Sequence, residues 1–361
     1  MLDMDAMLCE VYNAETAVII PGSGSYAMEA VARQFATGKK AMSLRNGYFS
    51  WRWTDIFETC DIPYKAVVAQ AGCVDKQPGC GTSRCPCGSK AQYAPMPIDD
   101  LEEYIHKEKP DVFFAPHVET STGILLPDEY IKRAAAAVHA NGGLFVLDCI
   151  ASGTLWVDMK EMGIDALITA PQKGWTGPAC AGIVMLSEDG LEATRRTSGT
   201  SLCCNLGKWL SVMDAYKSGG FAYHTTMPTD ALVVARDAMV LTKQFGFERA
   251  RAAALELGAR VRSVLCEDRG LVSVAAPGFE APGVVVVHTD DGAILSKFLG
   301  AGTQIAAGVP FKIGEHPGTK TFRIGLFGLD KLADPAVTCA SFEEVLNVAV
   351  PKAAKAAAAA A

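Results

Sequence analysis

The length, composition and charge of the chain indicate a globular protein large enough for two domains. Its 361 residues are 50% hydrophobic and 20% charged, which is enough apolar material for a sizeable core. A net charge of −7 without a basic cluster excludes a nucleic-acid-binding protein. No apolar run is long enough to span a bilayer. We therefore expect neither nucleic acid nor a membrane among its partners.

The first two thirds of the chain alternate short apolar runs with helical patterns. The runs that predict strands are Ala17–Ile20, Ala41–Leu44, Ala66–Ala69, Asp111–Ala115, Leu144–Leu147, Ala166–Thr169 and Gly182–Leu186. The intervening helices are expected at Tyr26–Thr37, Arg52–Thr59, Ile98–Lys107 and Asp128–Ala140. This pattern is typical of an α/β domain with a mainly parallel seven-stranded sheet. Ligands of such sheets bind beyond the carboxyl ends of the strands.

The last third predicts a smaller α+β domain. One long helix is expected from Thr229 to about Cys266. The shorter elements expected after it are strands Leu271–Ala275, Gly283–His288 and Thr321–Gly325 and helices Ile294–Leu299 and Phe342–Val350. We expect a large domain over residues 1–245, a small domain over 246–350 and a low-complexity Lys/Ala tail over 351–361.

A turn of small residues, Gly22-Ser-Gly-Ser25, joins the first predicted strand to its helix. Free backbone N–H groups and two hydroxyls at a helix N-terminus suit a phosphate group. A Gly/Ser turn is also a common structural cap. The glycine spacing does not match a dinucleotide fingerprint, and no Lys-Ser/Thr pair marks a nucleotide-triphosphate loop.

A carboxylate and a lysine each follow an apolar strand. Asp148 follows Leu144–Leu147, where its charge needs a partner; a helix cap or a metal ligand is the alternative. Lys173 follows Ala166–Thr169, where partial burial favours the neutral, nucleophilic amine. Pyridoxal phosphate needs this arrangement, because the Asp keeps the pyridine nitrogen protonated and the Lys binds the cofactor as a Schiff base.

Several motifs occur in a definite order along the chain. They are Gly22–Ser25, His117–Gly123, Asp148–Ser152, Pro171–Lys173, Tyr223–Pro228 and Phe322–Gly328. In this order they resemble class V aminotransferases, in particular the alanine–glyoxylate, serine–glyoxylate and serine–pyruvate branch, from about residue 10 to 345. The resemblance implies the fold of type I pyridoxal-phosphate enzymes and a homodimer with shared active sites.

The resemblance also implies the contacts of the cofactor. Its phosphate is expected to contact Ser23, Gly24, Ser25 and Gln172. Tyr223 and Thr226 are expected to reach the phosphate in the partner subunit. Around the ring, the expected contacts are Asp148 at the nitrogen, Thr120 at the phenolic oxygen, Ile150 beneath the ring and Phe49 stacked on it. Phe49 is a departure, because the family usually has Trp there.

The substrate is expected to bind Arg323, since a guanidinium in an apolar strand needs an anion and a carboxylate fits it. An ion pair with a protein carboxylate is the alternative. His117 and Glu119 are interpreted as satisfied polar residues, and His224 as a structural histidine. The expected reaction is ping-pong transamination between alanine or serine and glyoxylate or pyruvate, with Lys173 moving the proton.

Two alternatives remain open for the function. A cysteine desulfurase or another pyridoxal-phosphate lyase would use the same lysine, but desulfurases have His where this chain has Gln172. A non-catalytic metal-binding variant would use the Cys-rich insertion over 72–90, through Cys73, Cys80, Cys85 and Cys87. Their spacing does not fit a zinc knuckle, so no metal site is expected. We expect a cytoplasmic protein, or a mitochondrial or peroxisomal one if a targeting segment precedes Met1.

Overall fold

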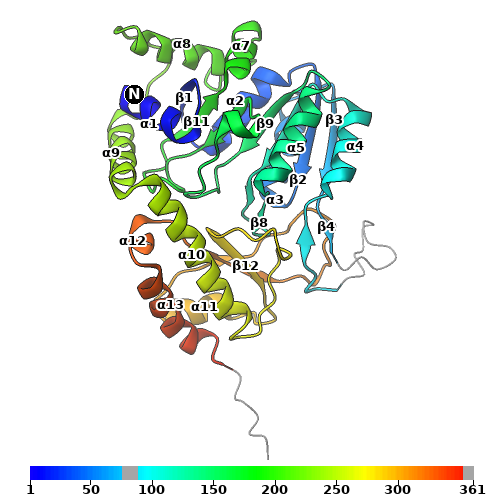
Figure 1. Cartoon of the computed structure of the whole chain (residues 1–361), viewed down its shortest axis with the longest axis vertical. Helices are drawn as coiled ribbons and strands as arrows, with labels where there is room; N and C mark the ends of the chain where they lie inside the picture. The colour runs from blue at the N-terminus through cyan, green and yellow to red at the C-terminus, as the bar shows by residue number, and fades with distance from the viewer. Residues whose placement is uncertain (75–87, 353–361) are drawn as a thin grey trace, which may run out of the picture.

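The structure, a computed structural model, describes residues 1–74 and 88–352. Its largest feature is a seven-stranded sheet (Figure 1). From edge to edge the strands are β1 (Thr16–Pro21), β11 (Ala181–Leu186), β10 (Ala166–Thr169), β9 (Leu144–Asp148), β6 (Val112–Pro116), β2 (Lys40–Arg45) and β3 (Lys65–Gln70). Six strands run in the same direction, and only β11 runs in the opposite one. The prediction of a mainly parallel seven-stranded sheet is therefore confirmed, and it contains all seven predicted strands.

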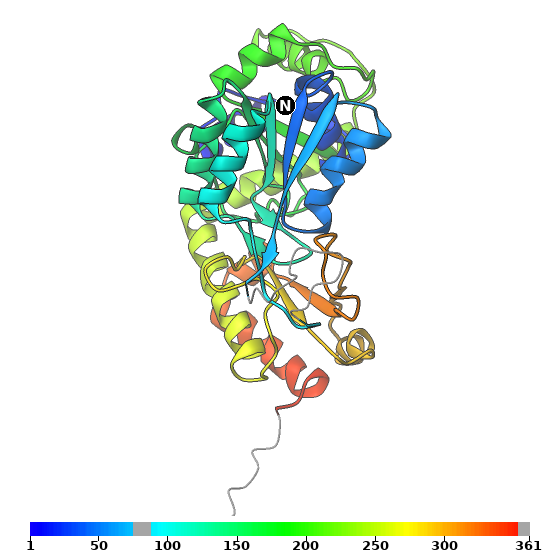
Figure 2. The ribbon, with the colours of Figure 1, turned by 90° about the vertical axis from the view of Figure 1, so that its right-hand side faces the viewer.

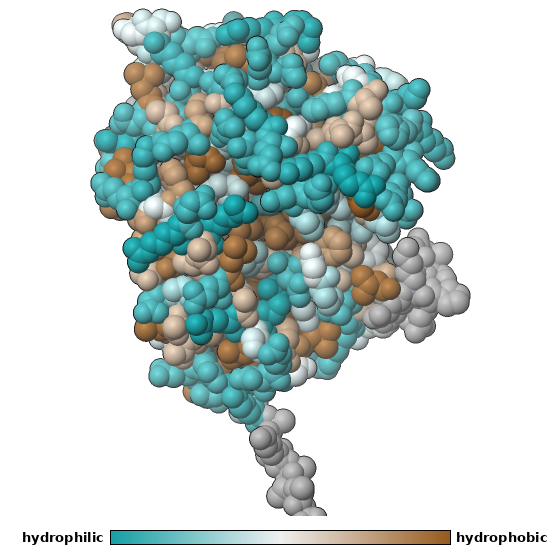
Figure 3. All heavy atoms as spheres, viewed as in Figure 1, coloured by the Kyte–Doolittle hydropathy of each residue, from teal (hydrophilic) through white to brown (hydrophobic). Residues whose placement is uncertain are grey.

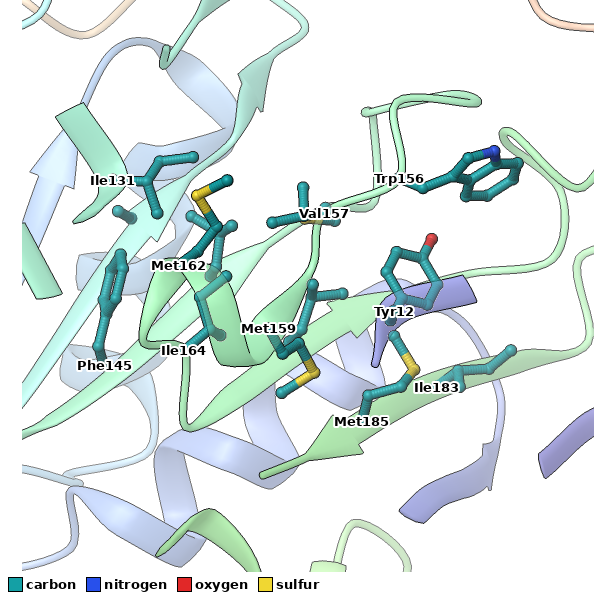
Figure 4. Close-up of a cluster of buried hydrophobic side chains, with 14 of the residues drawn as sticks. Tyr12, Ile131, Phe145, Trp156, Val157, Met159, Met162, Ile164, Ile183 and Met185 are labelled. Atoms are coloured by element: carbon teal, nitrogen blue, oxygen red, sulfur yellow. The ribbon is translucent and has the colours of Figure 1, made fainter. Parts of the chain in front are cut away.

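Helices cover both faces of this sheet (Figure 2). The helices packed on one face are α2 (Gly24–Phe35), α3 (Tyr48–Thr59), α7 (Glu188–Arg196) and α8 (Leu206–Lys217). Those packed on the other are α1 (Leu2–Tyr12), α4 (Ile98–Glu108), α5 (Asp128–His139), α6 (Met159–Met162) and α9 (Thr229–Phe245). Both faces are apolar because consecutive strand residues point to opposite sides: Phe113 belongs to one core and Phe114 to the other. Figure 4 shows part of the core that contains Phe113, to which Tyr12, Ile131 and Phe145 also contribute.

The last third forms a second, smaller layer beside the large sheet (Figure 1). Its antiparallel sheet has the order β12 (Val284–His288), β14 (Thr321–Gly325) and β13 (Ala306–Ala307). Its helices are α10 (Phe247–Cys266), α11 (Ile294–Gly300), α12 (Leu329–Leu332) and α13 (Pro335–Ala349). These elements share their own apolar core. The remaining strands form two short pairs, β4 (Gly72–Cys73) with β5 (Tyr93–Ala94) and β7 (Val118–Glu119) with β8 (Ile124–Leu125).

Two predicted elements of this region are wrong. The single long helix is broken into α9 and α10 at Gly246, whose φ of 98° lies outside the helical region. The predicted strand Leu271–Ala275 makes only isolated bridges, Ser273 with Val287 and Ala275 with Tyr93. The helix break coincides with the predicted domain boundary near residue 245, and the division into domains 1–245 and 246–350 stays a prediction.

The surface is largely hydrophilic on the face that Figure 3 shows. Among residues 1–74 and 88–352, no helix combines the length and the apolar character needed to cross a membrane.

Candidate active site

A cavity of about 170 Å³ lies where the parallel strands of the large sheet end. Its lining residues are Ser23, Gly24, Ser25, Met28, Phe49, Arg52, Pro116, Val118, Thr120, Asp148, Ile150, Ala151, Gln172 and Lys173. Every residue predicted to contact the cofactor from within one subunit is in this set. A larger hollow of about 520 Å³, lined by residues between positions 289 and 321, shares no lining residue with it. We place the chemistry in the smaller cavity, because it alone of the two contains the lysine and the buried carboxylate.

The turn after β1 presents backbone to the cavity. Ser23 is the N-cap of α2, and no side chain caps that helix. The first amide groups of α2 are therefore available to an anion. At Gly24 an added Cβ would lie 2.6 Å from Cδ1 of Ile150. A larger residue at this position would require the Ile150 side chain to move.

Asp148 ends β9 and is only 8% exposed. The amide of Ile150 donates a hydrogen bond of 2.9 Å to its Oδ1. Burial raises the pKa of Asp148 to about 7, and the positive charges of Arg52 and Lys173 oppose this rise without cancelling it. The site therefore favours a cationic or proton-donating partner beside this carboxylate.

Lys173 lies in the turn after β10, next to the strand that carries Asp148. Burial lowers the pKa of Lys173, and the charges of Arg323 and Arg52 lower it further. A lowered pKa increases the fraction of neutral, nucleophilic amine. The following Gly174 packs so tightly that an added Cβ would lie 2.0 Å from the carbonyl oxygen of Gly153. This close approach fixes the backbone that carries the lysine.

Gln172 carries a buried Oε1 that has no hydrogen-bond partner in the part of the chain that the structure describes. Because its side chain lines the cavity, a ligand with hydrogen-bonding groups would complete its environment.

Glu119 fixes the first turn of α3 on the other side of the cavity. It is fully buried and accepts hydrogen bonds from the amides of Phe49 (3.1 Å) and Ser50 (2.8 Å). It also accepts from the Ser50 hydroxyl and from the amide and hydroxyl of Ser121. A carboxylate at a helix N-terminus is favourable there. The structure thus assigns Glu119 to positioning α3, in agreement with its interpretation as a satisfied polar residue.

His117 has a similar structural setting. It is buried, and its Nδ1 lies 2.8 Å from the Ser152 hydroxyl. Burial lowers the pKa of His117 to about 4, so the ring is neutral near pH 7. It does not line the cavity.

Arg323 comes to the site from the three-stranded sheet. It lies in β14 opposite Val286, and its Nε donates to the carbonyl of Ala307 at 2.9 Å. Its guanidinium carbon is 5.8 Å from the centre of the Phe49 ring. Among the described residues no carboxylate lies within salt-bridge distance of it, and the charge of Glu119 acts on it only from further away. The predicted alternative of an internal ion pair therefore has no support there.

Tyr223 and Thr226 are not brought to the cavity of their own chain. Tyr223 is 79% exposed and Thr226 is also exposed. Arg52 is the reverse case, because it lines the cavity although the sequence did not single it out. Its position three residues after Phe49 is the signal that could have found it, since residues i and i+3 share a helix face.

The residues of the metal-binding alternative mostly lie outside the described ranges. Cys80, Cys85 and Cys87 are among them, and Cys73 is buried in β4. Over residues 1–74 and 88–352, no group of three or more His, Cys, Asp or Glu side chains is arranged to bind a metal.

Comparison with known proteins identifies the family. The profile of the family Aminotransferase class-V matches residues 65–306. A serine–glyoxylate aminotransferase of Methylorubrum extorquens is 24% identical over 83% of this chain and 73% of its own length. Another of Hyphomicrobium methylovorum is 27% identical over 60% of this chain, and the match spans only 48% of that enzyme. The crystal structure of an alanine–glyoxylate aminotransferase from Nostoc sp. superposes with a TM-score of 0.76 at 20% identity, over 96% of this chain and 86% of that one. The chain belongs to the class-V aminotransferases, a family of pyridoxal-phosphate enzymes.

Proposed function

We propose that this chain transfers an amino group between a small amino acid, alanine or serine, and a small 2-oxo acid, glyoxylate or pyruvate. The observation that carries the proposal is the pairing of Lys173 and Asp148 in one cavity, at the ends of the neighbouring strands β10 and β9. The substrates are supported by the names of relatives that act on serine or alanine with glyoxylate.

The lining of the cavity fits pyridoxal phosphate. Asp148 would face the ring nitrogen, because a buried carboxylate whose pKa is raised to about 7 gains a charged partner there. Ser23, Gly24, Ser25 and Gln172 would bind the phosphate. Phe49 and Ile150 would hold the two faces of the ring, and Thr120 would approach its phenolic oxygen. When bound, the cofactor supplies an electron-withdrawing ring that stabilises negative charge on the α-carbon of the substrate.

Lys173 would carry out the proton transfer. Its lowered pKa leaves a neutral amine that can bind the cofactor covalently and, once released, accept the proton from the α-carbon. No hydrogen bond or ion pair occupies its Nζ among the described residues. The same amine would therefore be able to return the proton to the C4′ carbon of the cofactor, which transamination requires.

Arg323 would orient the amino acid. Its guanidinium has spare donors, because within residues 1–74 and 88–352 its side chain makes only the Nε bond to Ala307. A planar guanidinium binds a carboxylate through two parallel hydrogen bonds. Its position beside Phe49 supports a substrate carboxylate bound next to the cavity, and its charge acts on Lys173.

A second copy of the chain is part of the proposal. The segment after α8 exposes large apolar side chains, with Phe221 87% and Tyr223 79% exposed, and Leu202 is 72% exposed. Exposed apolar groups of this size favour a protein interface. In a two-fold dimer Tyr223 and Thr226 would contact the phosphate in the partner subunit.

The alternatives fit the site less well. A cysteine desulfurase would have His in place of Gln172, and the described lining of the cavity contains no cysteine. A metal-binding role would depend on residues outside the described ranges.

The test is the visible absorption of purified protein with added cofactor. Bound cofactor should give a visible band that L-alanine or L-serine removes and that glyoxylate or pyruvate then restores. Lys173→Ala should abolish the covalent attachment, seen by mass spectrometry after borohydride reduction, and lower transamination by about 10³-fold or more. Lys160→Ala, which changes a lysine 59% exposed, is the matched control. A band that L-cysteine alone removes, with formation of alanine and with sulfide appearing only when a reducing thiol is added, would favour the desulfurase.

A further inference from the structure

The cavity contains one cation to which the proposed function gives no role. Among its lining residues only Lys173 and Arg52 are basic. Arg52 extends from α3, and its Nη1 lies 3.5 Å from the hydroxyl of Ser25. Its guanidinium therefore reaches the first turn of α2, where the phosphate is expected.

Arg52 forms no salt bridge with a carboxylate within residues 1–74 and 88–352, although its charge acts on Asp148 in the same cavity. Its guanidinium lies over two rings of its own helix, 4.9 Å from the centre of Phe49 and 5.8 Å from that of Tyr48. These rings orient the side chain and leave most of its N–H donors free. A partly buried guanidinium with free donors is a binding group for phosphate or carboxylate.

The charge of the phosphate indicates which anion Arg52 binds. A phosphate monoester carries a charge of about −1.5 to −2 near pH 7, whereas a helix N-terminus supplies only about +0.5. Ser23, Ser25 and Gln172 are neutral donors, and Lys173 is committed to the other end of the cofactor. Arg323 lies on the small-domain side of Phe49 and does not line the cavity. Arg52 is thus the one full positive charge in the described lining that can face the phosphate.

We propose that Arg52 binds the phosphate of pyridoxal phosphate and supplies most of the positive charge for this group within one subunit. This inference rests on the proposed function, because it assumes that the cavity takes that cofactor. Glu119 contributes indirectly: it holds the amides of Phe49 and Ser50, and so fixes the turn of α3 from which Arg52 extends.

The test compares pyridoxal phosphate with pyridoxal, which lacks the phosphate. Cofactor-free protein is titrated with each compound, and binding is followed by quenching of tryptophan fluorescence. Arg52→Met should weaken the binding of pyridoxal phosphate by roughly 10- to 100-fold, the effect of one charge-assisted hydrogen bond. Its affinity for pyridoxal should stay within about 2-fold of wild type. Arg52→Lys, which keeps the charge, should recover part of the loss.

Arg249→Met is the matched control, because Arg249 is exposed and also stacks on a phenylalanine, 4.3 Å from the centre of the Phe245 ring. It should change neither affinity. Inorganic phosphate gives a second readout: it should compete with pyridoxal phosphate for wild type and compete more weakly for Arg52→Met.

Three outcomes would overturn the assignment. If Arg52→Met lowered the affinity for both compounds equally, Arg52 would only support the Phe49 ring. Unchanged affinity for pyridoxal phosphate with a raised KM for the amino acid would make Arg52 a substrate group. A wild-type protein that binds neither compound would overturn the proposed function itself, and is distinguishable from the other two because the defect is then not confined to the variant.

Discussion

The two groups of predicted cofactor residues lie in opposite surroundings. Asp148 and Lys173 follow adjacent strands and line one cavity. Tyr223 and Thr226 lie on an exposed segment and touch no part of that cavity. The parallel sheet alone is therefore enough to bring the first pair together, whereas the second pair needs another molecule to acquire a role. Changes in the two regions should differ accordingly in what they alter.

Among variants that keep Lys173, the largest effect is expected from Asp148→Asn in the buried region. Removing one charge of a buried pair costs about 3–5 kcal/mol, so transamination should fall by about 10²- to 4 × 10³-fold. Asn keeps the shape of the side chain, and the fold should remain intact by circular dichroism. A variant with more than a third of wild-type activity would contradict the role of Asp148 at the ring nitrogen.

The same variant should remove a pH dependence of the free energy of unfolding of the cofactor-free protein. Burial raises the pKa of Asp148 to about 7 in the folded state, above its usual value near 3.8. The folded state then binds the proton more tightly than the unfolded state, so this group makes stability fall as the pH rises from about 4 to about 7. Asp148→Asn should therefore be more stable than wild type at pH 8 by up to about 4 kcal/mol, and the two should converge at pH 4. Urea unfolding at both pH values measures the difference, and a gap that does not grow with pH would contradict the assignment.

A somewhat smaller effect is expected from Gly174→Ala, which tests the backbone that carries Lys173. The added methyl group would meet the carbonyl oxygen of Gly153 at 2.0 Å, and relieving this overlap should cost about 3 kcal/mol in the free energy of unfolding. Gly207→Ala, within α8, is the control, because the atom nearest to an added Cβ, Oδ1 of Asn205, would lie 3.7 Å from it. That control should gain up to about 1 kcal/mol. Equal stabilities for the two variants would show that the turn after β10 is not tightly packed.

The same contrast explains how much the sequence predicted. Short apolar runs such as Leu144–Leu147, alternating with helical patterns, predict the strands of a parallel sheet, so the sheet and the residues at its carboxyl edge followed from the pattern. The break at Gly246 did not, because a single glycine is tolerated within a helical pattern and only the packing decides its φ. The strand expected at Leu271–Ala275 failed because its ladder needs a partner along its whole length, and it meets Val287 and Tyr93 only singly.

Arg52 was missed for a different reason. In the sequence it is one more charged residue on an amphipathic helix, for which a solvent-exposed position is the usual expectation. Its position depends on where Glu119, 67 residues further on, holds the first turn of α3. The spacing of three residues from Phe49 places Arg52 on the same helix face, but no local pattern contains the long-range contact that fixes where this face lies. The residues that the sequence placed best are those fixed by the strand that carries them.

The smallest effect, expected from Tyr223→Phe, tests the exposed region. The side chain is 79% exposed in one chain, so loss of its hydroxyl should leave the unfolding of a dilute, dissociated protein unchanged. In the dimer the hydroxyl would bind the phosphate in the partner subunit. Its removal should lower the affinity for pyridoxal phosphate about 5- to 10-fold, the effect of one hydrogen bond. Tyr64→Phe is the matched control, since Tyr64 is 71% exposed and has no proposed contact. The loss should disappear when the protein is diluted below the concentration at which sedimentation shows dissociation. A loss that persists in the monomer would place the Tyr223 hydroxyl in the site of its own chain and remove the distinction between the two regions.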